Sequence, residues 1–170
     1  MSPRTRVAVC AAIFAVQTSA AQKPSGCASD WYRVLDFWIG SWDVHLRNGT
    51  LAGTDIVEKT LDGCVVLEHW TDVNGNRGES FFYYHPAEKV WKQVWVVPSG
   101  AMKEKQATPP QTPGPIRFAG KAYLPDGRAI HDHTTLTPQT DGTVQQVIEQ
   151  SSDGGKTWHM SFDAIHSKRH

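Results

Sequence analysis

The 170-residue sequence predicts an all-β protein, an up-and-down antiparallel barrel of about ten strands. From residue 41 onward, strand-like segments follow one another, turn signals such as Asn-Gly and Asp-Gly separate them, and no crossover helix lies between them. Short links of this kind join antiparallel strands, and closure into a barrel removes the exposed edges. We expect strands over 41–47, 54–61, 64–72, 78–84, 90–97, 101–108, 116–124, 129–137, 143–150 and 157–167.

One segment with helical character precedes the first strand. Ser29 or Asp30 would cap a short helix, and Gly40 would end it. The longest irregular segment, "TPPQTPGP" over 108–115, contains four prolines, which do not fit a central strand. We expect a rigid loop there that gates the mouth of the barrel.

Residues 1–21 have the pattern of a secretory signal peptide. Arg4 and Arg6 precede an apolar run over 7–16, and small residues that include Ala20 and Ala21 follow it. The apolar run is shorter than the roughly 20 residues that cross a bilayer. We therefore expect cleavage after residue 20 or 21, export to the periplasm or the medium, and one barrel domain over residues 22–170.

Charge and cysteine content limit the partners and the compartment. The sequence has 17 Lys and Arg against 17 Asp and Glu and shows no basic block, which argues against nucleic acid and anionic membrane surfaces as partners. Cys27 and Cys64 remain after residue 21, and in an oxidising compartment such a pair predicts a disulfide, with two buried thiols as the alternative. The sequence specifies neither a cofactor nor an oligomeric state.

The segment "SSDGGKTW" over 151–158 fits the Asp-box pattern S-x-D-x-G-x-T-W of sialidases and other β-propellers. A propeller needs at least four blades of four strands, and such proteins carry several copies of the motif. This chain is too short and has a single copy, so we interpret the segment as a hairpin turn.

The stretch "VLDFWIGSWDV" resembles the G-x-W signature of lipocalin-like (calycin) barrels. In that family the tryptophan plugs the closed end of the barrel and a basic residue near the end of the last strand stacks over it. The resemblance assigns these structural roles to Trp42 and to Arg169 or Lys168.

Further pieces extend the resemblance over most of residues 30 to 166. "LDGCVVLEHW", "SFFYYHP", "VWKQVWVVPSG" and "DGTVQQVIEQSSDGGKTWHMSFD" are similar to a family of exported bacterial lipocalin-like proteins of unknown function. "FWIGSW" also distantly resembles the nitrobindin-type haem barrels, although the glycines that follow the tryptophan in that group are missing here.

Candidate ligand contacts follow from the alternation of side chains along strands. In "VWKQVWVV", Trp91, Gln93 and Trp95 share the face opposite the lysine, so we expect them to point into the barrel. The same reasoning places Glu68 and Trp70 inside, although both faces of "CVVLEHW" are largely apolar. Together these five residues predict a pocket with aromatic walls and two polar anchors. The structural alternative is a buried Glu–Gln hydrogen bond that fixes strand register.

These patterns favour an exported barrel that holds a small, partly apolar or aromatic ligand. The first alternative is a small periplasmic lyase, isomerase or hydrolase that uses Glu68 as general acid or base, with His133 as its proton partner. The second is a haem- or metal-binding barrel. "HDH" places His131 and His133 on one strand face, but no third ligand follows at a recognisable spacing.

Overall fold

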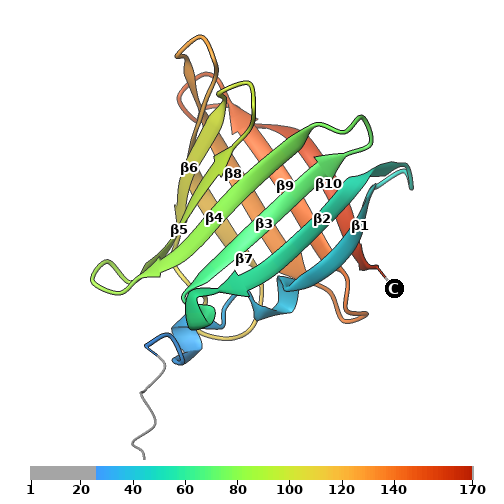
Figure 1. The fold of residues 1–170 in the computed structure, drawn as a ribbon. Helices are drawn as coiled ribbons and strands as arrows, with labels where there is room; N and C mark the ends of the chain where they lie inside the picture. The colour runs from blue at the N-terminus through green and yellow to red at the C-terminus, as the bar shows by residue number, and fades with distance from the viewer. Residues whose placement is uncertain (1–25, 170) are drawn as a thin grey trace, which may run out of the picture.

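The computed structural model describes residues 26–169, which form a closed barrel of ten antiparallel strands (Figure 1). Each strand pairs with its neighbours in the chain, and β1 pairs with β10 to close the sheet. The predicted up-and-down barrel is therefore confirmed. The strands are β1 Gly40–Leu46, β2 Leu51–Thr60, β3 Val65–Asp72, β4 Arg77–His85, β5 Val90–Val96, β6 Met102–Ala107, β7 Ile116–Tyr123, β8 Ala129–Pro138, β9 Val144–Ser151 and β10 His159–Lys168.

Five hairpins share one tight turn, which explains why the strand boundaries are readable from the sequence. In each turn the amide of a glycine donates to the carbonyl three residues earlier, and the glycine has a φ near +83° that other residues rarely adopt. Asp72, Asp126 and Asp141 add side-chain bonds to backbone amides of three of these turns. The five glycines are Gly49, Gly75, Gly100, Gly127 and Gly142.

The helical segment before β1 consists of two 3₁₀ turns, η1 Asp30–Tyr32 and η2 Asp36–Trp38, rather than one helix. Ser29 lies at the N-cap of η1 but makes no side-chain capping bond. In a 3₁₀ turn, residues three apart project from the same side. This spacing brings Leu35 and Trp38 together beneath the barrel, where both are fully buried.

Trp42 fills the closed end of the barrel. Its Nε1 donates to the carbonyl of Trp38 at 2.9 Å, and its ring is fully buried. Lys168 places its Nζ 3.9 Å from the centre of this ring and donates to the carbonyl of Ile39 at 2.6 Å. The assignment of the stacking role to Arg169 is wrong. The register pairs Trp42 with Lys168, so Arg169 points outward, where its guanidinium lies 3.5 Å from Asp43.

The predicted disulfide is present between Cys27 and Cys64, whose Cα atoms are 5.0 Å apart. It ties the N-terminal segment to η3 Leu61–Gly63, the turn between β2 and β3. Closing a loop of this length stabilises the fold by about 4 kcal/mol in the chain-entropy model. The predicted signal peptide over 1–21 lies outside the described residues.

The proline-rich loop is not at the mouth of the barrel. Its residues 110–114 share a groove with Trp31, Val34 and Phe37 of the N-terminal turns, so it lies at the closed end. The expectation that this loop gates the mouth is therefore wrong. The opposite end carries the hairpins that follow β1, β3, β5, β7 and β9 (Figure 1).

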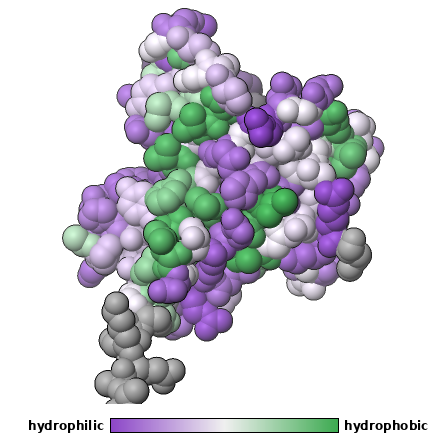
Figure 2. Space-filling view, viewed as in Figure 1, coloured by the Kyte–Doolittle hydropathy of each residue, from purple (hydrophilic) through white to green (hydrophobic). Residues whose placement is uncertain are grey.

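The outer surface mixes polar and apolar side chains (Figure 2). Ile56, Phe81 and Val96 are among the exposed apolar residues, on β2, β4 and β5. Between them, His69 of β3 lies beside Glu58 and Glu79. Within residues 26–169, no helix is long and apolar enough to cross a membrane.

The contacts of Lys168 predict that its replacement destabilises the protein more than the replacement of its neighbour Arg169. We expect Lys168→Met to lower the free energy of unfolding by about 1–2 kcal/mol, because it removes a cation–π contact and a charged hydrogen bond. Arg169→Met, which removes only an exposed ion pair, should change it by less than about 0.5 kcal/mol. Urea unfolding at pH 7 measures both, and equal losses would contradict the assignment of Lys168.

Candidate functional site

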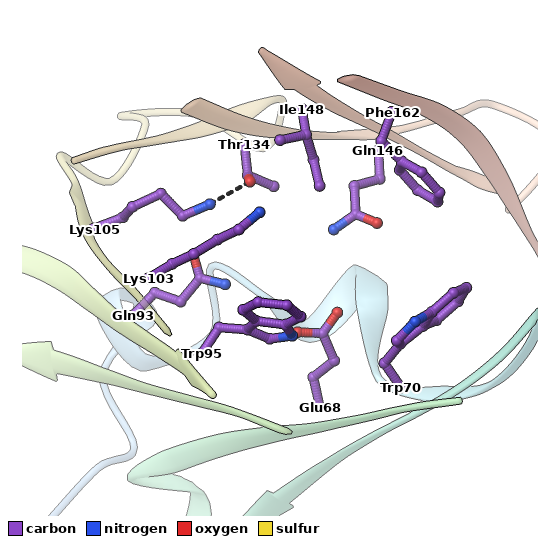
Figure 3. A pocket seen from close by; sticks show the side chains of 10 residues that line it. All are labelled: Glu68, Trp70, Gln93, Trp95, Lys103, Lys105, Thr134, Gln146, Ile148 and Phe162. Carbon is purple, nitrogen blue, oxygen red and sulfur yellow. Dashed lines mark hydrogen bonds between the residues drawn. The ribbon is translucent and has the colours of Figure 1, made fainter. Parts of the chain in front are cut away.

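The half of the barrel away from the closed end contains a cavity of about 210 Å³ (Figure 3). The closed half is packed with large side chains such as Trp38, Phe82 and Phe118. The cavity lies beneath the hairpin end, where β3, β5 and β6 contribute residues close to their turns. Its walls are Glu68, Trp70, Gln93, Trp95, Lys103, Lys105, Thr134, Gln146, Ile148 and Phe162.

Glu68 and Gln93 both face this cavity, as the alternation of β3 and β5 predicts. They do not bond each other directly. Ser80 of β4 lies between them: its hydroxyl donates to Glu68, and the Gln93 amide donates to that hydroxyl at 3.4 Å. Burial raises the pKa of Glu68, and the Ser80 bond and the nearby lysines offset part of this shift. Gln93 Oε1 is buried and has no hydrogen-bond partner within residues 26–169.

Two of the three predicted tryptophans line the cavity. Trp70 packs edge-to-face against Phe162 with ring centres 6.3 Å apart, and Trp95 lies 5.1 Å from Lys103 Nζ. Trp91 also points inward, but it is not a cavity wall. It lies four residues before Trp95, about 13 Å away along the strand. At that level it is fully buried in the closed end and donates to the carbonyl of Trp31 at 2.9 Å.

Strands β6 and β8 contribute a cluster of charged residues that the sequence patterns did not predict. Lys105 donates to Asp132 at 2.6 Å and to Thr134, and Lys103 lies 3.2 Å from the other oxygen of Asp132. Burial lowers the pKa of Lys105 to about 8, while Asp132 opposes this shift. The pKa of Asp132 is lowered because the two lysines outweigh the effect of its burial. Gln150 donates to Asp132 at 2.9 Å and completes the cluster.

A second buried group, Asp55 with His166, connects the cavity to the closed end. Burial and the charge of Glu68 raise the pKa of Asp55 well above its usual value, and burial lowers that of His166 to about 4. Burial therefore favours the neutral form of both side chains, which lie 3.5 Å apart. His166 Nε2 lies 3.2 Å from Gln146 Oε1, so this nitrogen carries the proton and Nδ1 accepts from Trp38 at 3.5 Å.

His133 does not face Glu68. Its ring lies on the outer face of β8, stacked on Trp158 with centres 3.8 Å apart, and it bonds Arg117. The expected role of His133 as proton partner of Glu68 is therefore wrong. The inward residue of "HDH" is Asp132, because alternate residues of a strand face opposite sides. His131 shares the outer face with His133 and also contacts Trp158.

The "SSDGGKTW" segment is the predicted hairpin turn, between β9 and β10. Asp153 accepts bonds from the amides of Lys156 and Thr157 and from two hydroxyls. These bonds hold the pKa of Asp153 below its usual range. The side chain thus orders the turn, which accounts for the motif without any sugar chemistry.

The cavity does not fit haem. Its volume of about 210 Å³ is below the roughly 300–1,000 Å³ of pockets for drug-sized ligands, and no histidine is among its walls. Within residues 26–169, no group of three or more His, Cys, Asp or Glu side chains is arranged to hold a metal ion.

The low pKa of His166 predicts a pH dependence of stability. Between pH 6.5 and about 4 the unfolded chain binds a proton at this histidine and the folded chain does not, so the free energy of unfolding falls as the pH is lowered. From pH 7 to 4.5 this group should contribute a loss of roughly 2–3 kcal/mol. In His166→Gln that part of the loss should disappear.

His159→Gln, at an exposed position of β10, is the matched control. Denaturant unfolding at both pH values gives the loss for each variant. If the two glutamine variants lose the same free energy as the wild type, the neutral state of His166 is wrong.

The chain matches no protein-family model and no curated protein. Its closed antiparallel barrel of ten strands, plugged by Trp42 and Lys168, is consistent with a lipocalin-like fold. A function must therefore be inferred from the cavity and its walls.

Proposed function

We propose that this protein is an exported binding protein that holds a small, partly apolar or aromatic molecule inside its barrel. The observation that carries the proposal is the cavity of about 210 Å³, which has both aromatic and polar walls. Barrels of this size enclose enough space for one small ligand, and binding sites combine apolar walls with a few placed polar groups.

The cavity walls offer a ligand two kinds of contact, apolar and polar. Trp70, Trp95 and Phe162 offer ring surface, and Ile148 adds an aliphatic contact. Aromatic pairs gain about 0.5–1.5 kcal/mol beyond their area burial, which favours a ligand with a ring. Glu68, held by Ser80, and Gln93 supply the polar contacts that fix its orientation.

The Gln93 carbonyl is the one buried acceptor of the Glu–Ser–Gln network that lacks a donor among the described residues. A buried acceptor without a donor costs about 1–3 kcal/mol, so a self-contained Glu–Ser–Gln network would satisfy it internally. Instead, Gln93 Oε1 is buried at a cavity wall without a partner among the described residues. The Glu–Ser–Gln network is therefore not complete within the described residues.

Export is supported by two independent features. Residues 1–21 have the pattern of a signal peptide, and Cys27 and Cys64 form a disulfide, which persists in oxidising compartments such as the periplasm. The resemblance to exported bacterial lipocalin-like proteins points to the same compartment. We therefore propose the periplasm or the medium as its compartment and a small molecule as its partner.

Acid–base catalysis by Glu68 is a second candidate function, because its raised pKa and its position at the cavity suit a general acid. The reaction would be a lyase, isomerase or hydrolase step on the bound molecule. With His133 outside the barrel, the titratable side chains that line the cavity beside Glu68 are Lys103 and Lys105.

The binding proposal is tested with a panel of one-ring compounds, screened by ligand-observed NMR and then by calorimetry. We expect binders whose affinity falls about tenfold in Trp95→Leu, because a ring contact of up to about 1.5 kcal/mol is lost. Trp158→Leu, in the outer turn between β9 and β10, should leave the affinity unchanged. No binder in the panel, or equal losses in the two variants, would contradict the proposal.

Glu68→Gln separates binding from catalysis. Glutamine keeps the acceptor for Ser80 but does not titrate, so a binder found in the panel should be retained within about threefold. At pH 7 this variant should also be more stable than the wild type, because the raised pKa of Glu68 opposes the ionised form in the folded state alone.

The stability difference should vanish as the pH falls below the unfolded-state pKa of Glu68. Consumption of the bound compound by the wild type but not by Glu68→Gln, followed by NMR over hours, would establish the catalytic function instead.

A further inference from the structure

We infer that the ligand of the cavity is a small aromatic carboxylate, with its carboxylate group at Lys103 and its single ring near Trp70 and Phe162. This inference rests on the proposed binding function and adds the charge and the size of the ligand to it. Two ammonium groups share one carboxylate in this cavity wall, and aromatic side chains lie across from them.

The charge count in this wall favours an anion. Lys103 Nζ and Lys105 Nζ lie 3.2 Å and 2.6 Å from the two oxygens of Asp132. Within residues 26–169, no second carboxylate lies within 4.0 Å of either ammonium. The side chains of Lys103, Lys105 and Asp132 are 13%, 1% and 0% exposed, so water screens this excess positive charge poorly.

The other two buried acidic groups near the cavity, Glu68 and Asp55, form no ion pair with Lys103 or Lys105. Burial raises the pKa of Glu68, and burial together with the charge of Glu68 raises that of Asp55. Burial therefore disfavours the ionised form of both carboxyls relative to an exposed carboxyl. A neutral Glu68 can donate its proton in a hydrogen bond to a carboxylate, whereas an ionised one would repel it.

Lys103 is the group that meets the ligand. Lys105 directs its ammonium to Asp132 and Thr134 and is nearly inaccessible. Lys103 extends its ammonium toward the middle of the cavity, with Trp70 and Phe162 on the far side (Figure 3). An ammonium has three donors, and Asp132 is the single ion-pair partner of Lys103 among the described residues.

The volume sets the size of the ligand. A cavity of roughly 150 Å³ holds one benzene molecule. The cavity of about 210 Å³ thus has room for one ring and a carboxylate, and not for a fused ring system with long substituents.

An isosteric charge series tests the inference. Benzoate, benzamide and benzamidine share one shape and carry charges of −1, 0 and +1 at pH 7. We expect benzoate to bind roughly tenfold more tightly than benzamide, because charge-assisted hydrogen bonds are about twice as strong as neutral ones, and benzamidine to bind most weakly. Calorimetry on the full-length exported protein at low ionic strength measures all three.

Lys103→Met identifies the group responsible. Asp132 keeps Lys105 and Gln150 as partners in this variant, so no buried charge is left unpaired. The preference for benzoate over benzamide should disappear, while the affinity for benzamide stays within about threefold. Lys121→Met, at an exposed position of β7, is the matched control and should retain the preference. Thermal unfolding confirms that both variants are folded.

The outcomes separate this inference from the proposed function. If benzamide binds as tightly as benzoate, or benzamidine binds most tightly, the inference is overturned and the binding function stands. If none of the three binds but another one-ring compound of the panel does, the inference is likewise overturned and the binding function stands. If no compound binds at all, both are overturned.

Discussion

Pairing of β1 with β10 is the constraint on which the interior of this protein depends. Once the sheet closes, every second side chain points into a volume whose size the number and tilt of the strands determine. Ten strands enclose more space than one layer of aromatic residues fills. Trp38, Trp42, Phe82 and Phe118 occupy the closed half, and the remaining space becomes the cavity.

The interior stays stable although it contains several ionisable side chains. A charge without a partner is costly inside a protein, and two physical solutions appear here. Asp132 remains ionised because it is surrounded by two ammonium groups and an amide. Burial raises the pKa of Asp55 and lowers that of His166, so it favours the neutral form of each. Both solutions depend on contacts between strands far apart in the sequence.

Local patterns therefore predicted the fold better than the site. Glycines at the turns mark the hairpins, and Lys92 of β5 shows which face is outward, so Gln93 and Trp95 were found. In β6, charged residues occupy both faces, and alternation gives no indication that Lys103 and Lys105 point inward. In β8, Asp132 lies four residues before the apolar Leu136 and so shares its inward face. The two histidines of "HDH" were considered as candidates instead, and this alternation was overlooked.

Two further errors have simple geometric causes. Alternation gives the face of a residue but not its height in the barrel, which is why Trp91 proved to be a core residue and not a cavity wall. Near the chain terminus a shift of one residue exchanges the two faces, and without the strand register Arg169 is indistinguishable from Lys168.

The two ends of the barrel differ in how strongly they are held together. The disulfide, the Trp42–Lys168 contact and the large aromatic residues all lie at the closed end, together with the long proline-rich loop. The other end has only hairpin turns, four of which are short loops that end in a glycine. Local opening is cheapest where buried contacts are fewest. Opening of the hairpin tips should therefore cost less free energy than global unfolding, so the molecule proposed to bind in the cavity would enter and leave while the closed end stays folded.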